Sequence, residues 1–128
     1  MTDSALKELL SVPALGALPH LELLHYLLSK DGGKHVAHCL DLDLIATGHS
    51  RDDAGIKLDA LVKAHIELSL ATGQLGNLQT RAPQPYWIRF HNGRRVTLHP
   101  ATIHIQIPDS VQIVPLPESR LRILAHAA

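Results

Sequence analysis

Residues 21–48 read LELLHYLLSKDGGKHVAHCLDLDLIATG, and this stretch decides the fold. Two extended apolar runs, residues 21–28 and 35–40, flank the turn sequence Asp31-Gly32-Gly33. A short hairpin turn needs backbone with positive φ, which glycine adopts at little cost. The stretch therefore predicts an antiparallel hairpin. Residues 41–47 predict a third short strand, which Gly48 ends.

The clearest helical pattern follows, over residues 50–72. Ser50 and Asp53 have the spacing of a capping box, and Asp52 and Asp53 suit the positive end of the helix dipole. Gly73 stands where a C-terminal cap is expected. We expect this helix to cover one face of the sheet with a buried stripe of residues spaced three or four apart: Ala54, Leu58, Leu61, Val62, His65 and Leu68.

The pattern after Gly73 is less regular. Residues 82–90 favour a short helix opened by proline, with an edge strand as the alternative. Residues 102–107 alternate strictly and predict a half-buried strand, and residues 111–114 predict an edge strand. The segment from residue 118 onward is compatible with a final strand or a frayed helix.

Together these patterns predict an α+β protein with a small antiparallel-rich sheet of three or four strands, a β-β-β-α core, packed on one long helix. We divide the chain into an N-terminal arm (residues 1–20), the core with its following short helix (residues 21–93), and a C-terminal β extension (residues 94–128). A chain of 128 residues is long enough for one such domain and too short for two.

Charge and composition exclude several classes of protein. Twelve Lys and Arg balance twelve Asp and Glu, and aromatic residues make up 3% of the chain, so the sequence lacks the features of a general nucleic-acid binder. The lone Cys39 excludes an intrachain disulfide and a cysteine-based zinc cluster. With no signal-peptide pattern and no apolar run of membrane-spanning length, we expect a soluble cytoplasmic protein.

Three motifs occur in order over residues 21–73: Asp31-Gly32-Gly33, then residues 36–42 (VAHCLDL), then residues 46–54 (ATGHSRDDA) leading into a Leu-rich helix. This succession resembles the HicB-like domain of bacterial toxin–antitoxin systems. The resemblance implies a truncated ribonuclease-H-like β-β-β-α unit, usually with a further strand. It also implies a non-enzymatic antitoxin-like protein that binds and masks a small basic ribonuclease toxin.

The sequence departs from that family in two places. Residues 40–44 (LDLDL) replace a Leu-Pro-Gly stretch that commonly precedes the third strand. Prolines also interrupt the region where many family members carry a DNA-binding helical segment, namely Pro100, Pro108, Pro115 and Pro117. The resemblance therefore implies the interaction half of the family, with no recognisable DNA-binding segment.

Asp41 and Asp43 are the candidate partner-binding residues. Strand alternation would place both carboxylates on one face, where they would attract a basic protein. The same two acids with Glu67 and magnesium would serve a divergent metal-dependent nuclease, which we regard as a less favoured alternative. Capping already explains the helix acids Asp52 and Asp53, so the sequence gives this nuclease little further support.

The ten histidines and Cys39 do not form a recognisable site. No helical His-x-x-x-His or Glu-x-x-His pair occurs, so we expect individually hydrogen-bonded histidines, no metal and no cofactor. Cys39 lies within a predicted strand, where a cysteine behaves as a small buried apolar residue. The basic residues Arg94 and Arg95 are expected in a solvated loop.

Ile103, Ile105 and Ile107 form an apolar strand face that must be covered. Either the chain's own sheet covers it, or the same strand of a second copy does. We therefore expect a homodimer or higher homo-oligomer with these isoleucines at the interface. A stand-alone oligomeric module of unknown activity is the alternative to the antitoxin-like function.

Overall fold

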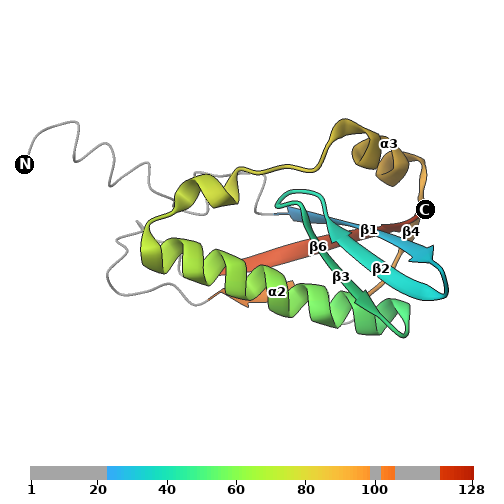
Figure 1. Cartoon of the computed structure of the whole chain (residues 1–128), viewed down its shortest axis with the longest axis horizontal. Helices are drawn as coiled ribbons and strands as arrows, with labels where there is room; N and C mark the ends of the chain where they lie inside the picture. Colours follow the sequence, from blue (N-terminus) through green and yellow to red (C-terminus); the bar gives the residue numbers. More distant parts are fainter. Residues whose placement is uncertain (1–22, 99–101, 106–118) are drawn as a thin grey trace, which may run out of the picture.

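The computed structural model describes residues 23–98, 102–105 and 119–128, and Figure 1 shows their arrangement. Six strands form one sheet, and helices lie on both of its faces. The elements in chain order are β1 (Leu23–Asp31), β2 (Lys34–Cys39), β3 (Leu44–Gly48), α2 (Arg51–Thr72), the 3-10 helix η3 (Leu75–Leu78), α3 (Gln84–Asn92), β4 (Arg94–Val96), β5 (Thr102–Ile105) and β6 (Ser119–Ala127).

The predicted hairpin is confirmed. β1 and β2 pair antiparallel, from Asp31↔Lys34 at the turn to Tyr26↔Cys39. Gly32 and Gly33 have φ of 57° and 87°, so each of the two turn residues occupies the region that favours glycine. β3 then pairs antiparallel with β2, as expected for the third strand.

The sheet is larger than expected, and the C-terminal segment is part of it. The strand order is β3-β2-β1-β6-β4, and β5 also pairs with β6. β6 runs parallel to β1, whereas the other four pairings are antiparallel. Residues 119–127 are therefore an interior strand of the same sheet, not a strand of a separate extension. Arg94 and Arg95, expected in a loop, form β4 against β6.

Helix α2 begins and ends where the sequence predicts. The Ser50 hydroxyl accepts a hydrogen bond from the Asp53 N–H at 3.0 Å, and Gly73 caps the other end with φ of 69°. The buried stripe differs from the predicted one, because Leu61 and Leu68 are 40% and 64% exposed. The residues that α2 buries are Ala54, Gly55, Leu58, Val62, Ile66, Ser69 and Leu70.

The opposite face of the sheet is partly covered by α3 (Figure 1). Pro83 caps this helix, which confirms the helical interpretation of the segment over the edge strand. Phe90 of α3 is buried against Leu27 of β1 and Leu40. The described residues therefore form two cores, a large one between the sheet and α2 and a small one between the sheet and α3.

The structure places two of the three candidate interface isoleucines in the large core. Ile103 and Ile105 of β5 are 4% and 8% exposed and pack with α2 residues of their own chain. Their own chain therefore covers both side chains, and no second copy is needed to bury them. Ile107, the arm at residues 1–20 and the strand expected at 111–114 lie outside the described residues.

In the described part of the chain, no helix combines the length and the apolar character needed to cross a membrane.

Candidate functional site

Three histidines from three neighbouring strands gather on the sheet face that α3 covers. His38 of β2 and His126 of β6 both stand opposite Leu27 of β1, one on each side. His25 precedes Leu27 by two positions, so alternation places its side chain on the same face. The three imidazoles therefore surround one buried leucine.

Aromatic side chains of α3 cover these imidazoles. The ring of Tyr86 lies 4.8 Å from that of His38, and the ring of Trp87 lies 5.2 Å from that of His25, measured between centroids. Phe90 stacks on His126 at 4.0 Å with an interplanar angle of 5°. Because Phe90 is buried and Tyr86 and Trp87 are partly open, the layer is closed beside β6 and accessible beside β2.

Asp41 and Asp43 lie in the turn between β2 and β3, and not on a strand as the sequence predicted. Asp43 has φ of 53°, the left-handed conformation that aspartate adopts more readily than most residues. The prediction that both carboxylates lie on one face assumed a regular strand, and the turn conformation breaks that alternation. The two carboxylates consequently contact different histidines.

Asp41 is buried, with 1% of its surface exposed. Its Oδ1 accepts a hydrogen bond from the backbone N–H of His25 at 2.6 Å, and its Oδ2 lies 3.0 Å from His25 Nδ1. A carboxylate that leaves water needs such partners, and the His25 tautomer with its proton on Nδ1 would supply the second one. Asp41 thus fixes the turn to β1 and has almost no surface with which to meet another protein.

Asp43 is the exposed member of the pair. Its side chain is 36% exposed, and its Oδ1 lies 2.7 Å from Nε2 of the buried His38. His38 also stands opposite Ile45 of β3 and contacts the ring of Tyr86. Asp43, Ile45 and Tyr86 are therefore neighbours around one imidazole, and all three are exposed. We call these three residues the turn patch.

Backbone hydrogen bonds hold the turn against the segment before α3. The Leu40 N–H donates to the His25 carbonyl at 2.9 Å, and the Ala82 N–H donates to the Leu40 carbonyl at 2.8 Å. The Trp87 indole N–H donates to the Ala82 carbonyl at 3.0 Å, and the Arg81 guanidinium lies 4.4 Å from the Trp87 ring centroid. β1, the turn and α3 are therefore connected through a series of hydrogen bonds.

The acids of the nuclease alternative do not meet. Asp41 and Asp43 contact histidines on the sheet face beneath α3. Glu67 lies on α2, which covers the opposite face, and pairs there with Lys63 at 2.8 Å. Among the residues that the structure describes, no group of three or more His, Cys, Asp or Glu side chains is placed to hold a metal ion. The geometry therefore gives the nuclease alternative no support.

Cys39 faces the large core, as expected for a buried apolar residue. Burial is the main cause that raises the pKa of its thiol, with the nearby Asp41 charge as a further cause. A thiol in this state is a poor nucleophile, because the thiolate is the reactive form. We assign it a packing role.

One polar pair was not predicted from the sequence. The hydroxyl of Tyr26 on β1 donates a 2.7 Å hydrogen bond to Asp59 of α2. Burial raises the pKa of Asp59 to about 6, and burial followed by the Asp59 charge raises the pKa of Tyr26. The sequence does contain a signal for this pair. Tyr26 alternates with core leucines, and Asp59 directly follows the buried Leu58.

No family model, curated protein or solved structure matches this chain.

Proposed function

We propose that this protein is a non-enzymatic, HicB-like interaction protein that binds a small basic ribonuclease toxin. The observation that carries the proposal is the order of elements: three antiparallel strands, a long helix on one face, and a further strand beside β1. This order supports the proposal, because the resemblance implies a β-β-β-α unit, usually with a further strand. The motif residues fall at the hairpin turn and the entry to α2.

The turn patch is the surface we assign to the partner. It combines a carboxylate, an aromatic ring and an aliphatic side chain on Asp43, Tyr86 and Ile45, a mixture suited to a protein interface. Asp43 would attract a basic partner, and the two apolar side chains would supply contact area. Asp41, the other acid expected to bind, would act from beneath by holding the turn in place.

The test begins with the neighbouring gene. A short reading frame beside this gene should encode a small basic protein that cleaves RNA when purified. An equimolar amount of the present protein should suppress that cleavage and form a complex of defined mass in light scattering. The absence of such a reading frame, or cleavage that persists at saturating protein, contradicts the proposal.

A charge reversal tests the assigned surface. Asp43→Lys should weaken binding of the basic protein at least tenfold, by roughly the energy of one charged interfacial contact. Asp31→Lys is the matched control, because Asp31 is an exposed acid at the end of β1, beside the hairpin turn and away from the turn patch. Equal effects of the two variants would mean that the partner senses overall charge and does not contact the turn patch.

We also infer a homo-oligomer and a cytoplasmic location as parts of this proposal. Ile103 and Ile105 do not serve as its interface, because the chain's own helix covers them. β3 is the better candidate, since it ends the sheet and its outer edge pairs with no other strand of the described residues. A monomer mass that stays constant over a concentration series in light scattering would contradict the oligomer.

A further inference from the structure

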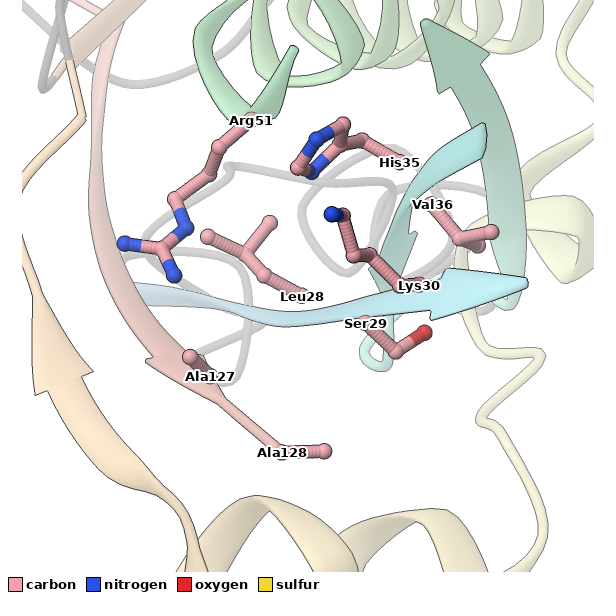
Figure 2. Close-up of a pocket in the computed structure, with 8 residues that line it drawn as sticks. All are labelled: Leu28, Ser29, Lys30, His35, Val36, Arg51, Ala127 and Ala128. Atoms are coloured by element: carbon pink, nitrogen blue, oxygen red, sulfur yellow. The ribbon is translucent and has the colours of Figure 1, made fainter. Parts of the chain in front are cut away.

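A hollow of about 310 Å³ opens where the β1–β2 hairpin approaches the start of α2. Figure 2 shows the side chains of Lys30, His35 and Arg51 around that of Leu28, with Ala127 of β6 beside them. Leu28 and Ala127 make the base of this space apolar, and three basic groups from three elements line it. We call it the basic hollow; it lies at the end of β2 opposite the turn patch.

Two of the basic groups face each other directly. Lys30 and His35 are cross-strand partners in the antiparallel pair of β1 and β2, so their side chains are neighbours on one face. Like charges directly opposite each other repel, and an anion between the exposed Lys30 and the half-buried His35 would relieve that repulsion. No carboxylate of the described residues forms an ion pair with either one.

The third group, Arg51, differs from the lysines of the same helix. Lys57 and Lys63 of α2 each pair with an acid four positions away. Arg51 has Ala54 and Gly55 at the corresponding positions, so α2 offers its guanidinium no carboxylate. The Arg51 side chain is half-buried and lines the basic hollow. It forms no ion pair in the described part of the chain.

We propose that the basic hollow binds a small phosphate monoester. The phosphoryl group would lie between Lys30, His35 and Arg51, and the organic part would rest on Leu28 and Ala127. A guanidinium binds phosphate through two parallel hydrogen bonds, an ammonium acts as a point charge, and an imidazole has an N–H to donate in either charge state. Three donors match the three terminal oxygens of a monoester, whereas a carboxylate has two.

Size and charge favour a small ligand over a nucleic acid. The volume lies near the lower limit of ligand pockets, roughly 300 to 1,000 Å³. A bound RNA would require basic groups along several successive phosphates, but the chain has no excess of Lys and Arg over Asp and Glu. The basic hollow offers one cluster for one phosphoryl group.

Isothermal titration calorimetry of the full chain at neutral pH tests this site. Phenyl phosphate should bind at one site per chain, inorganic phosphate should bind there more weakly, and benzoate and phenol should not saturate. Arg51→Gln and Lys30→Gln should each weaken phenyl phosphate binding about tenfold, as expected for loss of one charge-assisted hydrogen bond. Lys57→Gln is the matched control on α2, because Lys57 does not line the hollow, and it should leave binding unchanged.

Amide chemical shifts locate the ligand independently. Phenyl phosphate should move the amide signals of Lys30, His35 and Arg51 and leave those of Arg94 and Arg95 in place. Asp43→Lys should leave phenyl phosphate binding unchanged, which separates this site from the toxin-binding proposal. Failure to saturate at millimolar phenyl phosphate, wild-type binding by both Gln variants, or shifts confined to Arg94 and Arg95 would overturn the site. Benzoate binding as tightly as phenyl phosphate, or displacement of phenyl phosphate by a short RNA without terminal phosphate, would overturn the monoester assignment.

Discussion

The Tyr26 hydroxyl donates a hydrogen bond of 2.7 Å to Asp59, joining the centre of the sheet to the middle of α2. Tyr26 has no exposed surface, so its hydroxyl depends on this acceptor. The bond joins the Asp59 side of α2 to the sheet, and Leu61 and Leu68 lie on the exposed side of the helix. The apolar pattern alone predicted neither the polar pair nor this orientation.

Removing the Tyr26 hydroxyl should destabilise the protein. Tyr26→Phe leaves the half-buried Asp59 carboxylate without its donor, at an expected cost of about 1 to 3 kcal/mol in the free energy of unfolding. Urea unfolding followed by circular dichroism measures the change. Tyr86→Phe is the control, because Tyr86 is exposed, and its effect should stay within about 0.5 kcal/mol.

The Asp59 carboxyl should make stability depend on pH in a defined direction. Burial raises its pKa from the ordinary 3.8 to about 6, so between these values the folded chain holds a proton that the unfolded chain has lost. Its contribution to stability is therefore complete below the lower value and declines as the pH rises to the upper one. Asp59→Asn does not titrate, so it should gain stability relative to wild type across that interval, by about 1 kcal/mol after solvent screening.

Urea unfolding of Asp59→Asn and wild type at a series of pH values measures this gain. Asp31→Asn is the matched control, since Asp31 is exposed and asparagine also suits the hairpin turn. Comparison of the two variants separates the loss of the half-buried Asp59 carboxyl from the loss of an exposed one. A flat difference for Asp59→Asn would show that this carboxyl does not favour its protonated form in the folded protein.

Asp41 should matter for folding far more than Asp43. Asp41→Ala leaves the His25 backbone N–H and imidazole without their buried acceptor, and we expect a loss of about 3 kcal/mol. Asp43→Asn removes a partly exposed charge yet keeps a residue that tolerates positive φ, so it should cost less than about 1 kcal/mol. Equal losses in thermal or urea unfolding would contradict the different roles assigned to the two acids.

Ile103→Ala separates a core role from an interface role. A buried isoleucine cut to alanine costs about 2 to 5 kcal/mol, whether or not the protein self-associates. We expect a lower unfolding midpoint with the same mass as wild type in light scattering. A changed mass with unchanged stability of the folded chain would instead place Ile103 at an interface between copies.

Gly93, between α3 and β4, should not tolerate a side chain. A Cβ there would lie 2.6 Å from the Ala127 carbonyl oxygen, which the β4–β6 pairing holds in place. Gly93→Ala should therefore cost about 1 to 3 kcal/mol, as in other overpacked sites. Gly76→Ala is the control with no atom within 4 Å, and it should be neutral or slightly stabilising in the same thermal unfolding measurement.

The sequence by itself determined the local structure of this protein. The hairpin follows from Gly32 and Gly33, and the limits of α2 follow from Ser50 and Gly73. Each depends on backbone torsions and hydrogen bonds among residues close together in the chain, so a short stretch contains all the information. The α+β class and the antiparallel first three strands follow from the same signals.

Only the tertiary structure decided the long-range arrangement. β6 lies parallel to β1 although about 100 residues separate Leu23 from Arg122, and no local pattern fixes such a pairing. In the same way, Asp41 of the turn is buried because His25 of β1 supplies its donors, and Ile103 is covered because α2 lies over β5. Burial depends on which distant elements pack together, and it separates the structural acid Asp41 from the exposed Asp43. The same packing brings three basic residues from different elements together as one candidate site.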